Sequence, residues 1–161
     1  MENSRYLDGV ILLRLLVAMI FAGIIGWDRE HSGHSAGLRT NMLVGMGAAL
    51  FTNTSDLLLR HFQAYDSAVH ADPIRVLQAI VLGISFLGSG VIFVSRHEDQ
   101  VHGLTTAASV WTVTGVGIVV GLGHFALGAA ITALVLIVLE AVRKIEAFSD
   151  GRKKADPQGK H

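Results

Sequence analysis

The feature that most constrains this chain is a series of five apolar stretches, each long enough to cross a lipid bilayer as a helix. The hydrocarbon core of a bilayer is about 30 Å thick, and a helix needs about 20 residues to cross it. None of the stretches alternates with period two, as the strands of a membrane β-barrel would. We therefore expect an all-α membrane protein, with a bundle of five transmembrane helices in residues 1–143. The predicted spans are residues 7–27, 38–59, 74–94, 104–122 and 125–142.

Two other interpretations of the apolar stretches are less consistent with the sequence. A cleaved signal peptide would begin with a basic region, whereas residues 1–5 are not basic and the charged residues 28–30 follow the first stretch. A soluble helical bundle would need a polar stripe on each helix, and almost no stretch has one. Only 16% of the residues are charged, against about 25% in a typical soluble domain.

Local residues at two links support the helical assignment. Asp72 and Pro73 are typical of a helix cap and of a first helical position, so they predict the start of the third span. The link at residues 121–124 is short enough to form only a tight turn, which predicts an antiparallel hairpin of the last two spans.

Charge and cysteine content exclude several function classes. The chain has 13 basic and 13 acidic residues, so it lacks the basic surplus of a nucleic-acid-binding protein. The absence of cysteine excludes disulfides, thiolate catalysis and cysteine-based metal sites. No phosphate-binding loop, nucleophile elbow, zinc-protease motif or dinucleotide fingerprint is present. We expect neither an enzyme nor a bound cofactor.

The distribution of Lys and Arg predicts the orientation in the membrane. Nine of these residues lie on the side of the C-terminal tail and three on the opposite side, while Arg14 lies inside the first span. Cytoplasmic loops are the richer in basic residues. We therefore expect the N-terminus outside and the C-terminus in the cytoplasm.

Small residues recur at helical spacing in four of the spans. In a bilayer, close packing through such residues replaces the hydrophobic effect between helices. They predict a tightly packed bundle, with a homodimer through the same faces as the other interpretation. The residues are Ala18, Ala22 and Gly26 in the first span, Gly45 and Ala49 in the second, Ser85 and Ser89 in the third, and Gly117 and Gly121 in the fourth.

Two charged residues fall within the predicted spans. Arg14 and Asp56 should both lie in the outer half of the membrane, on neighbouring antiparallel helices. Isolated charges at that depth are costly, so an Arg14–Asp56 ion pair is expected. The pair is either structural or part of an ion path, and a path would indicate a channel or transporter for a cation or small solute. Alternatively, Arg14 forms no pair and extends its side chain to the membrane interface.

Two loops contain residue types that ligate metals. Asp28 and Glu30, close to His31 and His34, are weak candidates for a metal site in the first loop. The loop between the second and third spans contains His61, Asp66, His70 and Asp72. Neither spacing specifies a metal geometry, and charged loops at a membrane interface are common.

Several stretches together resemble the MgtC/SapB family of bacterial inner-membrane proteins. The resemblance implies a five-helix, multi-pass protein of the inner membrane, linked to magnesium homeostasis, growth in low magnesium and virulence. It also implies that the protein regulates other membrane proteins such as the F-type ATP synthase, rather than carrying Mg²⁺. The stretches are residues 14–16, 26–30, 36–40, 83–92, 103–111 and 120–123.

The same resemblance implies a set of motif positions, of which most lie at helix ends on the predicted inner side. A ligand or an acidic partner could bind at the helix starts, because free backbone N–H groups favour anions there. Alternatively, Asp28 and Glu30 cap these helix ends within one chain. The motif positions are Asp28, Arg29, Glu30, Arg39, Thr105 and Thr106, and Thr40 joins them at the start of the second span.

The C-terminal region departs from the common family pattern. Many relatives have a soluble domain after the fifth helix, whereas this sequence resembles a short form without it. We expect residues 144–161 to be a polar, basic cytoplasmic tail that is disordered against anionic lipid.

Overall fold

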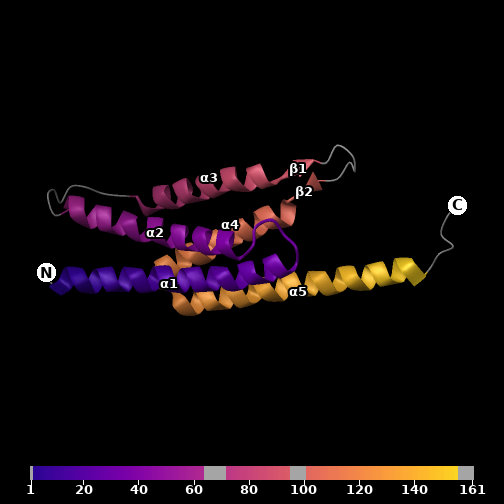
Figure 1. Ribbon diagram of the computed structural model, residues 1–161. Helices are drawn as coiled ribbons and strands as arrows, with labels where there is room; N and C mark the ends of the chain where they lie inside the picture. The colour runs from indigo at the N-terminus through magenta and orange to yellow at the C-terminus, as the bar shows by residue number, and fades with distance from the viewer. Residues whose placement is uncertain (1, 64–71, 95–100, 156–161) are drawn as a thin grey trace.

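Five helices make up most of the chain that the structure, a computed structural model, describes: residues 2–63, 72–94 and 101–155. All five are long and apolar enough to cross a membrane, as the sequence predicted. Figure 1 shows them side by side, with the two ends of the chain at opposite ends of the bundle. The helices are α1 (Glu2–His31), α2 (Leu38–Gln63), α3 (Pro73–Val91), α4 (Leu104–Gly121) and α5 (Phe125–Ala155).

The third helix ends earlier than predicted. It was expected to reach residue 94, but α3 ends at Val91 and Ile92 has an extended backbone. Strands β1 (Phe93–Val94) and β2 (Val101–His102) then form a two-residue antiparallel pair. An apolar run with β-branched residues suits a strand as well as a helix, so composition alone placed this boundary too late.

The fifth helix is longer than predicted, and the expectation of a disordered tail from residue 144 is wrong as far as Ala155. Residues 143–155 continue α5 without a break. They include several strong helix formers, and Glu140 lies 3.3 Å from Lys144 one turn later. The last part of the predicted tail, residues 156–161, lies outside the described residues.

Both predicted links have the expected local structure. Asp72 caps α3, because its side chain accepts a hydrogen bond of 2.9 Å from the Ile74 backbone N–H, and Pro73 takes the first helical position. At the other link, His124 N–H donates to the Val119 carbonyl and Gly123 has a φ of 91°. This turn joins α4 and α5 into a hairpin.

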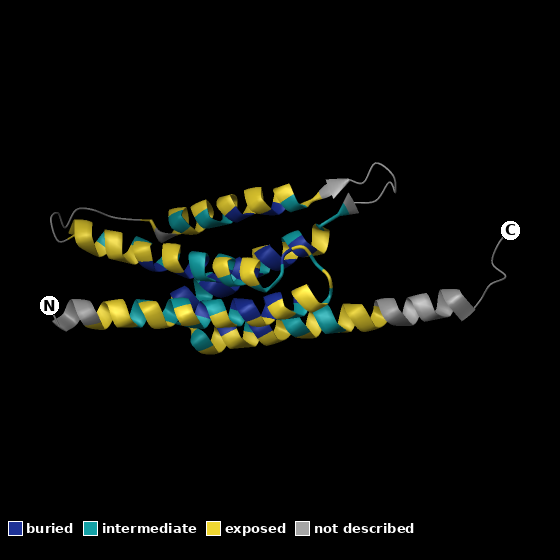
Figure 2. Ribbon diagram, viewed as in Figure 1, coloured by how far each residue is buried: buried dark blue, intermediate teal, exposed yellow. Residues whose placement is uncertain are grey.

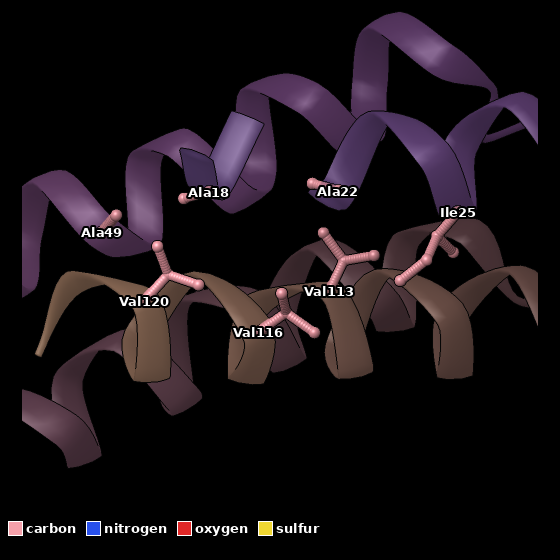
Figure 3. Close-up of a cluster of buried hydrophobic side chains, with 7 residues drawn as sticks. All are labelled: Ala18, Ala22, Ile25, Ala49, Val113, Val116 and Val120. Carbon is pink, nitrogen blue, oxygen red and sulfur yellow. The ribbon is translucent and has the colours of Figure 1, made fainter. Parts of the chain in front are cut away.

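The core lies where α1, α2 and α4 meet, with α5 packed beside them (Figure 3). It consists of small and β-branched side chains rather than large ones, so the helix backbones approach closely. A Cβ atom built on Gly45 would lie 2.5 Å from the Ala22 Cβ, and one on Gly117 would overlap the Gly45 carbonyl oxygen. The buried cluster contains Ala18, Ala22, Ile25, Ala49, Val113, Val116 and Val120.

The small-residue faces of α1, α2 and α4 are therefore used within one chain. Gly26 packs against Asn41, and Gly121 packs against Ala49. Because these faces are already packed within the chain, a second copy of the protein could not bind to them, and a homodimer cannot form through them. Ser85 and Ser89 on α3 are exposed, so only they keep that prediction open.

Helix α3 lies at the edge of the bundle, and most of its residues are exposed (Figure 2). Leu82 and Phe86 are 74% and 79% exposed. Large apolar side chains also cover the outer faces of the other helices. Apolar surface on this scale suits a bilayer and not water.

Candidate functional site

An apolar groove lies between α2 and α3, and we call it the α2/α3 groove. Its volume is about 900 Å³, within the size range of ligand-binding pockets. Only one residue of α4, Thr114, reaches its floor. The walls are Leu43, Val44, Gly47, Ala48, Phe51, Thr54, Ser55, Leu58, Leu59 and Phe62 of α2, and Val76, Ala79, Ile80, Gly83, Ile84 and Leu87 of α3.

Two glycines line the groove, Gly47 on α2 and Gly83 on α3. A Cβ atom built on Gly47 or on Gly83 would meet no atom within 4 Å. The glycines of the core are different, because a Cβ on Gly45 or Gly117 would clash with a neighbouring helix. The chain thus has glycines in the groove wall that its own packing does not require, although glycine costs a helix about 1 kcal/mol relative to alanine.

A second feature is a partly buried polar cluster around Arg14, near the α4–α5 turn. Arg14 Nη1 donates hydrogen bonds to Asn53 Oδ1 at 2.9 Å and to the Gly121 carbonyl oxygen at 3.0 Å. A Cβ atom on Gly123 would lie 3.0 Å from Arg14 Nη2. Arg14 therefore connects α1 to α2 and to the C-terminal end of α4, where a positive charge is favourable.

The predicted Arg14–Asp56 ion pair is not formed. Asp56 Oδ2 instead accepts a hydrogen bond of 2.9 Å from Arg60 Nε, one turn later on the same helix. Both side chains of that pair are more than half exposed, and Arg14 bonds Asn53, three residues before Asp56. The neutral amide of Asn53 can accept the hydrogen bond from Arg14 because it is buried in the closely packed helix contact. There its own Nδ2 donates a hydrogen bond to the Ala49 carbonyl oxygen.

At the opposite end of the core, Glu30 acts as the helix cap that the sequence suggested. Its Oε2 accepts a hydrogen bond of 2.7 Å from the Leu38 backbone N–H at the start of α2. Asn41 supports the same turn, because its Nδ2 donates to the Ala36 and Gly37 carbonyl oxygens. This contact fixes the loop between α1 and α2.

Asp28 was also suggested as a cap of an inner helix start, but it does not cap α4. Its Oδ1 lies 3.5 Å from Arg143 Nη1 of α5, and the same nitrogen lies 3.3 Å from Ser32 Oγ. Arg143 also contacts Glu140. Asp28 thus links α1 to α5, while the helix-start residue of α4, Gly103, makes no side-chain cap.

The remaining motif positions divide into buried and exposed ones. Arg29 and Thr106 are buried, with 4% and 3% of their surface exposed. Arg39, Thr40 and Thr105 are exposed at the starts of α2 and α4. They belong to the end of α1 and the starts of α2 and α4, which lie at the same end of the bundle (Figure 1).

The weak metal candidates have other roles. Glu30 bonds a backbone N–H and Asp28 faces Arg143. In residues 2–63, 72–94 and 101–155, no group of three or more His, Asp or Glu side chains could hold a metal ion. Of the second loop's candidates, Asp66 and His70 lie outside the described residues.

Three functional features were not predicted from the sequence. Asn41 and Asn53 make the second span polar, but the contacts of the two amides could not be predicted, although a buried amide in a membrane helix is a recognisable signal. The α2/α3 groove has no sequence signal of its own, since it depends on the distance between two helices.

Comparisons with known proteins agree with the resemblance. The MgtC family model matches residues 15–148. The putative magnesium transporter YhiD of Escherichia coli K12 is 38% identical over 134 residues, which are 83% of this chain and 61% of that protein. Protein MgtC of Salmonella typhimurium 14028s is 38% identical over 159 residues, 94% of this chain and 64% of MgtC. Protein SapB of Bacillus subtilis 168 is 34% identical over 146 residues, 88% of this chain and 62% of SapB.

The chain thus spans about three fifths of the length of these relatives. No solved structure matches it at a significant level. The family match extends from residue 15, in the first half of α1, into α5, so it covers the core and the groove and begins just after Arg14. The chain belongs to the MgtC family of membrane proteins.

Proposed function

We propose that this protein regulates another membrane protein by binding one of its transmembrane helices in the α2/α3 groove. The F-type ATP synthase is the partner that the family resemblance suggests, and growth in low magnesium and virulence are the processes it suggests. The proposed activity is binding, without catalysis. The observation that carries the proposal is the open groove itself, about 900 Å³ in volume and lined mainly by apolar residues.

The chemistry of the groove fits a helix as its occupant. Helices in a bilayer associate by close packing through small residues and by hydroxyl hydrogen bonds. The groove offers Gly47 and Gly83, whose Cα positions are open to an approaching backbone. It also offers the hydroxyl groups of Thr54 and Ser55. A partner helix would fill space that lipid chains otherwise occupy.

The location and orientation belong to the same proposal. We place the chain in the bacterial inner membrane, with the N-terminus outside and the C-terminus in the cytoplasm. The support is the excess of Lys and Arg, nine against three, on the side of the C-terminal tail. Five crossings put the two ends on opposite sides in either orientation.

Groove-filling variants test the proposal. Gly47→Leu and Gly83→Leu add side chains where no atom lies within 4 Å, so the protein should fold normally while the groove is blocked. The matched control is Gly90→Leu, because Gly90 is also unhindered and on α3 but does not line the groove. Co-purification of ATP synthase subunits with the tagged protein should be lost in both groove variants and kept in the control. Equal recovery with all variants would refute the groove as the binding site.

A second function, transport of a cation or small solute, has one structural observation in its favour. Arg14 and Asn53 form a polar cluster within helices long enough to cross a membrane. The printed name of the relative YhiD also describes a putative magnesium transporter. Purified protein in liposomes should show no Mg²⁺ flux under the regulator proposal. Flux that disappears with Arg14→Ala would establish transport instead.

A further inference from the structure

A buried cation with two unbonded nitrogen atoms, Arg29, lies in the last turn of α1. Only 4% of the surface of Arg29 is exposed, and its Nε and Nη2 atoms are buried without a hydrogen-bond partner. The negative charge of the adjacent Asp28 interacts favourably with Arg29, but it does not bond these two nitrogen atoms. Buried charges in proteins are normally paired and hydrogen-bonded, because an unpaired one loses its hydration without compensation.

The two neighbouring carboxylates do not supply the missing bonds. Asp28 is adjacent in the chain, but its nearest cationic partner is Arg143 of α5 at 3.5 Å. Glu30 uses Oε2 to bond the Leu38 backbone N–H. The partial negative charge at the C-terminal end of α1 favours a cation there, yet the N–H groups on Nε and Nη2 of Arg29 remain unbonded.

A second unsatisfied group lies at the same end of the core. Asn41 is completely buried, and its Oδ1 has no hydrogen-bond partner although its Nδ2 has two. Asn41 packs against Gly26, which precedes Arg29 by about one helical turn. The junction of α1 and α2 therefore has unused donors on a cation and an unused acceptor on an amide.

We propose that Arg29 binds a phosphate group at this junction. A guanidinium matches phosphate because its N–H groups donate parallel hydrogen bonds to two oxygens. A phosphate that retains one P–OH group could also donate to Asn41 Oδ1. Inorganic phosphate and the monoester headgroup of phosphatidic acid share this chemistry, and the end of a membrane-spanning helix is within reach of both. The proposal does not depend on the α2/α3 groove.

Thermal unfolding of the full chain in detergent micelles tests the site. A ligand that binds only the folded state raises the unfolding midpoint in a saturable way. Inorganic phosphate is titrated against chloride at equal ionic strength, and phosphatidic acid in the micelles is compared with phosphatidylcholine. A response to inorganic phosphate identifies the free ion as the ligand, and a response to phosphatidic acid alone identifies the lipid.

Substitutions at Arg29 connect the response to the residue. Arg29→Met should weaken the apparent phosphate affinity by about 10- to 100-fold, the equivalent of one lost charge-assisted hydrogen bond. Without phosphate it should unfold at the same or a higher temperature, because an apolar side chain replaces a buried charge. Arg75→Met is the control, since that side chain is 84% exposed and lies at the start of α3.

Two results would overturn the proposal. One is a wild-type midpoint that neither phosphate nor phosphatidic acid raises. The other is a response of Arg29→Met equal to that of the wild type. If Arg29→Met does not fold, Arg29→Lys keeps the charge without the planar fork, and equilibrium dialysis of phosphate against wild type and Arg29→Lys gives the same decision. Equal affinity in that pair would contradict a guanidinium site.

Discussion

Helices α4 and α3 have nearly the same length, 18 and 19 residues, but they contact the rest of the molecule very differently. Half of the membrane-length segment of α4 is buried, against 6% of that of α3. The buried helix has small and hydroxyl residues at its contacts, such as Thr106, Ser109 and Gly117, whereas α3 exposes Leu82 and Phe86. In a bilayer, the residues that hold helices together are thus small, hydroxyl-bearing or β-branched rather than large and apolar.

The contrast also separates the structural from the adaptable part of the molecule. Around α4, the helices approach closely at glycines where any larger side chain would clash. At both ends of the core, polar side chains form hydrogen bonds between helices. Helix α3 contacts α4 at a few positions, such as Gly88 beside Ala107. A partner could therefore displace lipid along α3 without disturbing the core. Four predictions test this division, in order of decreasing effect on stability.

The largest effect is expected for Gly45→Leu. A side chain at this position would overlap Ala22 and separate α1 from α2 and α4, which costs about 3 kcal/mol or more by analogy with overpacked cores. The measurement is the free energy of unfolding in mixed micelles, with the fraction of monodisperse protein as a second readout. A variant as stable as the wild type would show that the core is loosely packed.

A smaller loss is expected for the polar cluster. Arg14→Met should cost about 1.5–3 kcal/mol, the range for a hydrogen bond to a charged group. In double-mutant cycles, Arg14→Met should couple to Asn53→Leu by about 1 kcal/mol and to Asp56→Ala by roughly zero, because the bond is to Asn53. Strong coupling to Asp56 would restore the ion pair that the sequence suggested.

The cap at the start of α2 should matter less. Glu30→Gln keeps an acceptor for the Leu38 N–H, whereas Glu30→Ala removes it, so only the alanine variant should lose about 1 kcal/mol. Hydrogen exchange of the Leu38–Asn41 amides would locate the loss at this helix end. Equal stability of the two variants would mean that the carboxylate contributes nothing as a cap.

The smallest effect is expected in α3. Gly83→Leu fills open space and improves helix propensity, so its stability should stay within about 0.5 kcal/mol of the wild type or rise slightly. The same measurement as for Gly45→Leu makes the comparison direct. A large loss would show that α3 packs more tightly against α2 than the groove implies.

The sequence predicted the number of helices, the cap at Asp72 and the α4–α5 hairpin, because bilayer length and turn chemistry are local properties. It missed the partner of Arg14, since Asn53 and Asp56 lie on nearly the same face of one helix and only the packed register separates them. It also missed the end of α3, where Val and Ile suit both helix and strand. The groove and the unbonded atoms of Arg29 depend on side-chain placement across helices, which no local pattern encodes.

The length of α5 has a mechanical consequence. A helix of 31 residues is about 46 Å long, and the hydrocarbon core is about 30 Å thick. If α5 begins at one face of that core, roughly 16 Å of continuous helix projects beyond the other face as a rigid lever. A tilt or rotation of α5 inside the bilayer would then move its aqueous end by a larger distance. The contact of Arg143 with Asp28 of α1 would be the point about which this end moves.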